Sequence, residues 1–304
     1  MGVGLKQYRS QFRITQQVLA EKIGVSQQTV ARWESGTSHI PSKYLKDLAV
    51  LFGGQVADFV EGAAGVGEKV VAIRPSATAS SDEDDLAWGG AMLRFCVVKP
   101  GDDESAAYSY PITGGEYNRL FEALHCLGDA GDESDGLWIE FKTLDNRWVI
   151  VNTAHLSGVT MLSDAVEMMP TYEHDEVYKA ARKILMGDLP NSDSTADDDY
   201  PYSENLMQSA RDFIEEVGNV DSAFTRIDGI AYETATGVRY GCAADDDALG
   251  ALHDTFELCS DHAAPNRFVD IGPEGQRHKS TFVRLGSLRL IEVSLLRLSD
   301  FLSQ

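Results

Sequence analysis

Residues 15–36, TQQVLAEKIGVSQQTVARWESG, contain two short helical patterns that meet at a glycine. Their apolar faces are Leu19, Ala20 and Ile23 in the first pattern, and Val30 and Trp33 in the second. Thr15 and Ser26 directly precede the two patterns, where a hydroxyl caps a helix N-terminus well. Gly24 stands where the first helix must end, because glycine adopts a positive φ at little cost. The stretch therefore predicts two helices joined by a tight turn.

The second of these helices has a polar face opposite Val30 and Trp33. At about 100° per residue, that face collects Gln27, Gln28, Ala31, Arg32 and Ser35. A helix buried in a core has no use for two adjacent glutamines and an arginine. A helix in a DNA major groove does, because glutamine pairs with adenine and arginine with guanine through two hydrogen bonds each. The methyl group of Ala31 can meet a thymine methyl in the same groove.

The stretch resembles the helix-turn-helix of the Cro/C1 (XRE, lambda-repressor-like) DNA-binding family. The family pattern runs T-Q-x-x-L-A, then G-V-S, then W-E-x-G, and every element stands here at the same spacing. The resemblance covers residues 1–62 and implies an all-α bundle of five helices. The flanking helices are expected from Gly4 to about Phe12, from Pro41 to about Phe52, and over residues 55–60. A small helical bundle used for protein contact is the alternative.

The resemblance also assigns residues to DNA contacts. It places Gln27, Gln28 and Arg32, with Ala31 beside them, where the family contacts base edges. It places Gln16 where the family holds a backbone phosphate. Gln17, Thr29 and Lys43 are further candidates for backbone contacts, although Lys43 is equally well explained as a solvated surface lysine. The expected partner is double-stranded DNA.

The charge of the chain is divided unevenly along its length. The net charge is −22, yet residues 1–60 hold seven basic and four acidic side chains. The remaining residues hold 19 basic and 44 acidic side chains, so they should be repelled by phosphates. Two explanations of this acidity stay open. One is solubility or a salty host cytoplasm, and the other is a basic protein partner.

The chain of 304 residues predicts several domains. We expect a helix-turn-helix domain over 1–62, a flexible acidic linker over 63–88, an α+β domain over 89–187, an acidic linker over 188–202 and a second α+β domain over 203–304. The fold class is thus multidomain, with an all-α head and an α+β body. No apolar run is long enough to cross a membrane, and the N-terminal MGVGLKQYRSQFR lacks an apolar signal core. We therefore expect a cytoplasmic protein without membrane contact.

Two segments of the body resemble each other. Residues 135–143, DGLWIEFKT, and 228–236, DGIAYETAT, align without gaps, and each follows a helical pattern with an R-x-F step, at Arg119 and at Arg211. One interpretation is a duplicated αββ unit, and the other is two unrelated αββ pieces in one α+β domain.

The body shows no pattern that supports catalysis or a cofactor. Some repressors of the resembled family carry a self-cleaving Ser-Lys peptidase domain, but no G-D-S-M-like nucleophile segment occurs here. Glycine-rich nucleotide-binding fingerprints are absent as well. The residues Cys242, His253, Cys259 and His262 have no spacing typical of a zinc finger. We expect no enzyme, no cofactor and no metal.

Three classes of function remain. The first is a sequence-specific DNA-binding transcriptional regulator, with an acidic body that senses a signal, dimerises or binds a protein. We expect it to be a homodimer on an inverted repeat, since one head contacts only a few base pairs. The second is an antitoxin or inhibitor, whose body binds a basic partner while its head regulates its own gene. A DNA-directed enzyme with a degenerate body is the third.

Overall fold

The computed structural model describes residues 3–60, 91–97, 106–129, 138–163, 174–187, 201–256, 268–271 and 282–303. The chain divides into two compact units. The head unit comprises 1–78 and 174–216, and the body unit comprises 79–173 and 217–304. Because each unit is made of two stretches of chain, the backbone passes between the units three times.

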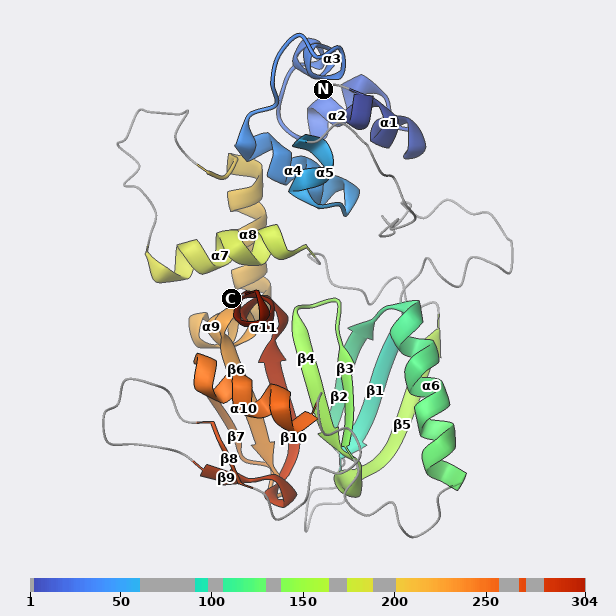
Figure 1. Ribbon diagram of the computed structural model, residues 1–304, viewed down its shortest axis with the longest axis vertical. Coiled ribbons are helices and arrows are strands. Elements are labelled where there is room, and N and C mark those ends of the chain that lie inside the picture. Colours follow the sequence, from blue (N-terminus) through green and yellow to red (C-terminus); the bar gives the residue numbers. More distant parts are fainter. Residues whose placement is uncertain are drawn as a thin grey trace. The chain divides into compact units, whose positions relative to one another are not determined.

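Five helices open the head unit (Figure 1). They are α1 (Val3–Gln11), α2 (Gln16–Lys22), α3 (Gln27–Glu34), α4 (Ser42–Phe52) and α5 (Val56–Val60). The apolar residues predicted to face inward from α2 and α3 are buried, as are Leu48 and Phe52 of α4. The rings of Tyr8, Phe52 and Phe59 meet with centroids 4.9–6.0 Å apart. The five-helix bundle and its core are confirmed.

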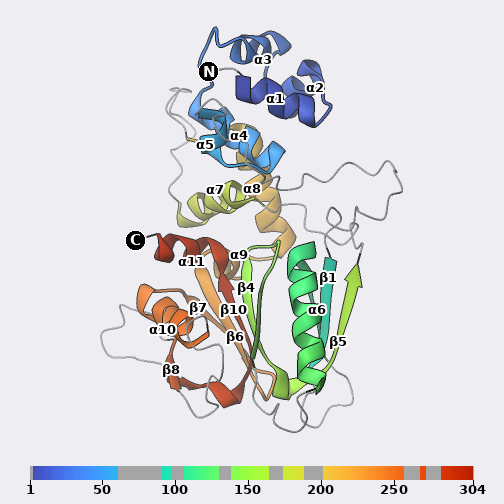
Figure 2. The ribbon, with the colours of Figure 1, turned by 45° about the vertical axis from the view of Figure 1, so that its right-hand side comes forward.

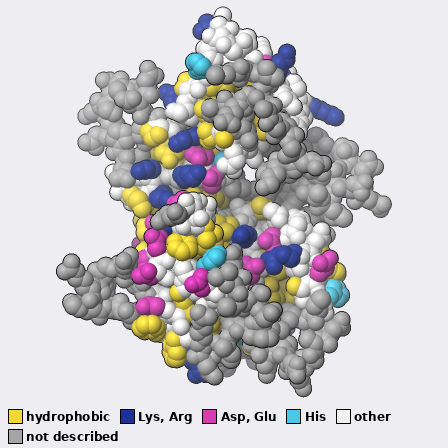
Figure 3. Space-filling view, viewed as in Figure 1, with side chains coloured by type: hydrophobic (Ala, Val, Ile, Leu, Met, Phe, Trp, Pro, Cys, Tyr) yellow, Lys and Arg dark blue, Asp and Glu magenta, His cyan; other side chains and the backbone are white. Residues whose placement is uncertain are grey.

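Two later helices, α7 (Asp175–Met186) and α8 (Glu204–Val217), complete the head unit. The rings of Tyr178 and Phe213 pack edge to face between them, at 5.1 Å between centroids. α7 contacts α4, and Ser203 Oγ donates to Asp47 Oδ1 of α4 at 2.6 Å. Over α7 the surface mixes basic and acidic side chains (Figure 3). Within α7, Lys179 pairs with Asp175 at 2.6 Å and with Glu176 at 3.0 Å.

The division into head unit and body unit differs from the domains expected from the sequence. There, α7 is the last helix of the α+β domain over 89–187, and α8 is the first helix of the α+β domain over 203–304. The buried faces of the two helices explain the difference, since they find their partners in each other and in α4. The expected linkers, 63–88 and 188–202, lie outside the described residues except for Pro201 and Tyr202.

The described residues of the body unit form three antiparallel sheets. The first runs β2-β1-β5, from β1 (Ala91–Val97), β2 (Ala106–Ile112) and β5 (Leu156–Ser163). The second runs β3-β4-β10-β6-β7, from β3 (Trp138–Lys142), β4 (Arg147–Asn152), β6 (Gly229–Thr234), β7 (Arg239–Ala243) and β10 (Leu288–Ser294). The third pairs β8 (Phe268–Asp270) with β9 (Phe282–Arg284).

Strand β10 joins parts of the body that the sequence analysis assigned to separate domains. It pairs with β4 on one side, at Ile291↔Ile150, and with β6 on the other, at Ile291↔Tyr232. Every residue of β10 is buried, as expected for a strand at the centre of a sheet. The hairpins β3–β4 and β6–β7 therefore belong to one sheet.

Helices cover the two faces of this sheet differently (Figures 1 and 2). On one face, Ile230, Ile291 and Val293 share a core with α10 (Asp246–Phe256) and α11 (Leu295–Leu302). On the other face, Val149 and Leu290 share a core with the first sheet and α6 (Gly114–Asp129). The α+β character of the body is confirmed.

One helix was not predicted from the sequence, and it bears on the αββ repeat considered for residues 135–143 and 228–236. Helix α9 (Val220–Asp228), capped by Asn219, fills a segment for which no element was predicted. It separates α8 from β6, whereas no such helix is described between α6 and β3. The helices that hold Arg119 and Arg211 also lie in different units. The duplication stays a prediction. No helix in the described parts of the chain is long and apolar enough to cross a membrane.

Candidate nucleic-acid interface

The turn between α2 and α3 has the geometry that its sequence predicts. Thr15 Oγ1 accepts from the N–H of Val18 at 3.2 Å, and Ser26 Oγ accepts from the N–H of Thr29 at 3.1 Å. Gly24 has a φ of +69°, which a residue with a side chain rarely adopts. Each helix therefore starts at a side-chain cap, and the turn between them is fixed by the backbone of one glycine.

A buried ion pair holds the first three helices together. Glu34, at the end of α3, is 9% exposed and accepts hydrogen bonds from Arg9 Nε at 2.6 Å and from Gln16 Nε2 at 2.7 Å. Arg9 Nη1 also donates to the carbonyl of Ile14 at 2.8 Å. Burial opposes ionisation of Glu34, but the bonds from Arg9 and Gln16 outweigh it and lower the pKa of the carboxyl. We call Arg9, Gln16 and Glu34 the clamp.

The clamp leaves the other side of α3 open. Gln27, Gln28 and Arg32 are exposed, and Ala31 beside them is half-buried. Over the part of the chain that the structure describes, no carboxylate forms an ion pair with Arg32. We call these four residues the outer face of α3. The face offers amide groups and a guanidinium to a partner, on a helix whose inner face is locked by Val30 and Trp33.

The candidates for backbone contacts lie in different settings. Gln16 is half-buried in the clamp, so its amide donor is occupied by Glu34. Gln17 is exposed and donates to Glu21 at 3.1 Å. Thr29 is half-buried, with Oγ1 at 2.8 Å from Ser26 Oγ. Lys43 lies in the first turn of α4, its Nζ 5.5 Å from the ring centroid of Tyr44. Their roles toward DNA stay predictions.

Comparison with known protein families agrees with this geometry. Residues 5–59 match the family model described as "Helix-turn-helix". Residues 5–59 are a helix-turn-helix domain of the Cro/C1 type. The helix-turn-helix domain supports a DNA-binding regulator in general, and it spans the first five helices of the head unit. The chain matched no curated protein and no solved structure.

The clamp is the part of the helix-turn-helix domain that the sequence analysis did not find. Its signal was present, because Glu34 is the acidic residue of the W-E-x-G element and Gln16 the glutamine of T-Q-x-x-L-A. The family resemblance assigns that glutamine only to a phosphate contact. The ion pair needs Arg9 as well, 25 residues from Glu34, and a pair so distant in sequence has no local pattern.

The residues considered for zinc do not form a site among the described residues. No group of three or more His, Cys, Asp or Glu side chains there is placed to hold a metal ion, while Cys259 and His262 lie outside that part of the chain. Burial and the nearby Asp245 raise the pKa of the Cys242 thiol to about 11. Its Sγ lies 3.4 Å from the carbonyl oxygen of Ile271, so at neutral pH it is a thiol that donates a hydrogen bond.

Proposed function

We propose that the protein is a sequence-specific, cytoplasmic transcriptional regulator that places α3 in the major groove of its operator. The observation that carries the proposal is the outer face of α3, where Gln28 and Arg32 stand exposed on a helix fixed by the clamp. A rigid helix with free amide and guanidinium groups can discriminate bases, because each bidentate contact contributes about 1–3 kcal/mol of specificity. In this proposal the protein performs no catalytic step.

We also propose that the regulator acts as a homodimer on an inverted repeat. One α3 inserted in a groove contacts only a few base pairs, and proteins of this kind gain specificity by using two half-sites about one helical turn apart. The proposed role of the body unit is to hold two heads in register or to receive a signal. Its 31 acidic and 13 basic side chains support a role away from the phosphates.

The same acidity favours one second candidate. An antitoxin or inhibitor would use the acidic body to bind a basic protein, while its helix-turn-helix domain controls its own gene. Affinity purification from the producing cell distinguishes the two candidates. A stoichiometric basic protein favours the second candidate, and full-length protein recovered alone favours the first.

Genome-wide mapping of bound DNA in the producing cell tests the regulator. We expect a small set of sites that share a symmetric motif upstream of genes. Signal spread evenly along the chromosome would contradict sequence-specific binding, because non-specific contacts follow the phosphates alone.

A further inference from the structure

The body unit contains a cavity of about 670 Å³ between α9 and the sheet strands β6, β7 and β10. Its volume lies within the range of about 300–1,000 Å³ that is usual for small-molecule sites. All its lining residues belong to the body unit. The site therefore shares no residue with the outer face of α3.

Small residues form the floor of this cavity. Ala231 of β6 and Gly241 and Ala243 of β7 line it, and Ala231 pairs with Gly241 across the two strands. A Cβ at Gly241 would lie 3.2 Å from Thr225 Oγ1 of α9, so glycine lets the helix approach the sheet there. The neighbouring Ile230 of β6 points into the core on the opposite face. The small side chains of β6 and β7 thus leave room between these two strands and α9.

Three arginines from different elements line the same cavity. They are Arg147 of β4, Arg226 of α9 and Arg239 of β7. The unit has only 13 basic side chains against 31 acidic ones, and three of the 13 gather here. Arginine presents a planar fork of donors that matches carboxylate and phosphate groups.

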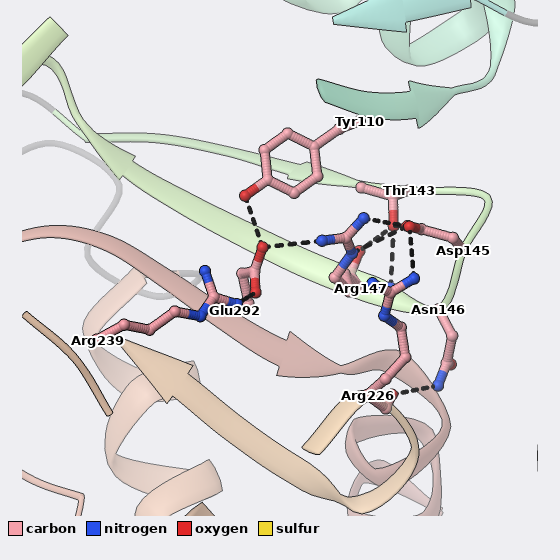
Figure 4. A network of polar contacts seen from close by, with 8 residues as sticks. All are labelled: Tyr110, Thr143, Asp145, Asn146, Arg147, Arg226, Arg239 and Glu292. Atoms are coloured by element: carbon pink, nitrogen blue, oxygen red, sulfur yellow. Dashed lines mark hydrogen bonds and ion pairs between the residues drawn. The ribbon is translucent and has the colours of Figure 1, made fainter. Parts of the chain in front are cut away.

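Two buried carboxylates link the arginines into one chain of alternating charge (Figure 4). Asp145 pairs with Arg147 and, at 3.0 Å, with Arg226. Glu292 pairs with Arg147 at 2.9 Å and with Arg239, while Tyr110 donates to the same carboxylate at 2.6 Å. The chain of charges begins and ends on an arginine.

The two terminal arginines are the more accessible ones. The Arg147 side chain is 13% exposed, whereas those of Arg226 and Arg239 are 27% and 45% exposed. Arg147 lies over the ring of Tyr110, at 4.5 Å from its centroid, and both carboxylates fix its orientation. Arg147 thus fixes both carboxylates, and through Glu292 it holds Arg239 in place, so an anion bound beside Arg239 needs little further ordering.

We propose that this cavity binds a small hydroxylated organic anion, whose carboxylate or phosphate group lies against Arg239, the most exposed of the three arginines. The α9 side of the cavity supplies the remaining contacts, from Ser222, Thr225 and the exposed Asp221. Hydroxyl and carboxylate oxygens there accept hydrogen bonds, so a ligand with hydroxyl groups opposite its anionic end fits both sides. Binding of this anion does not depend on the DNA-binding function proposed above. An effect of the anion on operator binding would depend on that function.

Thermal unfolding of the full-length protein tests the site without any DNA. Three probes are titrated at constant ionic strength against sodium chloride: inorganic phosphate, citrate and glucose 6-phosphate. We expect citrate or glucose 6-phosphate to raise the Tm by a few °C in a saturable way, because a ligand that binds only the folded state stabilises it. Preference for citrate or for glucose 6-phosphate decides between a carboxylate and a phosphate ligand, and either one supports the proposal.

Matched variants locate the binding. Arg239→Ala should weaken it at least about tenfold, as expected when a charged hydrogen bond is lost. Arg94→Ala, at an exposed arginine of β1, removes the same charge and should change nothing. Ala243→Leu narrows the cavity, leaves every ion pair in place and should also weaken binding. It remains informative if Arg239→Ala does not fold. Absence of saturable binding of all three probes, or equal binding by wild type and Ala243→Leu, would overturn the proposal.

Discussion

Specific DNA binding, in our account, depends on two side chains of the outer face of α3. Gln28→Ala and Arg32→Ala should each weaken operator binding by about 1–3 kcal/mol and relax the preference at one base pair. Affinity for a scrambled duplex should change much less. Fluorescence anisotropy on both duplexes at fixed salt measures the difference. Arg211→Ala, at an exposed arginine of α8, is the control for loss of charge. Equal losses on both duplexes would remove Gln28 and Arg32 from base recognition.

The clamp residues also contribute to the stability of the folded protein. Glu34→Gln leaves the guanidinium of Arg9, which is 15% exposed, without its anionic partner, so the protein should lose about 1–3 kcal/mol of stability at pH 7. The pKa of Glu34 is lowered in the folded protein, so its contribution is present above pH 4.5 and is lost as the pH falls. Thermal unfolding of full-length variants measures this loss. Glu21→Gln, at an exposed glutamate of α2, should cost little. Equal stability of the two variants would show that the clamp contributes nothing.

At the scale of elements, Asp47 makes the packing of α7 and α8 on α4 sensitive to pH. Burial raises the pKa of Asp47 to about 6, against the lowering effects of Ser203 and Lys43. Oδ1 accepts from Ser203, whereas Oδ2 is buried and has no hydrogen-bond partner in the described structure. The folded state therefore binds a proton more tightly than the unfolded state, and stability should fall as the pH rises from about 4 through 6.

Asp47→Asn removes this penalty. Its Tm should exceed that of wild type above pH 6, by an amount that corresponds to at most about 3 kcal/mol, and should match wild type near pH 4. The amide oxygen can still accept from Ser203, so the packing is kept. Glu204→Gln, at an exposed position of α8, controls for the charge. A constant difference between Asp47→Asn and wild type from pH 4 to 8 would contradict the assigned pKa.

The elements show where sequence patterns suffice and where they fail. Local signals predict the helix caps at Thr15 and Ser26 and the turn at Gly24, because caps and turns involve near neighbours. Strand β2 continues through Pro111, although proline argues against a strand. It can do so because β2 is an edge strand, where a missing N–H costs no ladder bond. Two features depend on residues far apart in sequence. They are the pairing of β10 with both β4 and β6, and the cavity lined by arginines. No local pattern predicts either feature.

At the scale of the whole molecule, two chain segments build each unit. The chain passes between the head unit and the body unit three times. Cutting the chain at residue 62 would also remove two hydrogen-bond partners of the helix-turn-helix domain. They are Ser203, which bonds to Asp47, and His174, which bonds to the carbonyl of Gly54. Experiments on DNA binding should therefore use the full chain.

The proposed dimer is tested on that full chain. We expect light scattering at micromolar concentration to give twice the mass of 33.2 kDa, because one α3 contacts too few base pairs for a specific site. The operator should then bind the protein with two chains per duplex. A mass of one chain, both free and on the operator, would contradict the homodimer and the inverted repeat together.

Selection from a random duplex library with the full-length protein tests the central claim most directly. Wild type should enrich one motif with two related half-sites centred about one helical turn apart. Arg32→Ala should enrich a motif in which one base position of each half-site has lost its preference. A library that stays random after repeated rounds, or the same motif from wild type and Arg32→Ala, would contradict sequence recognition by the outer face of α3.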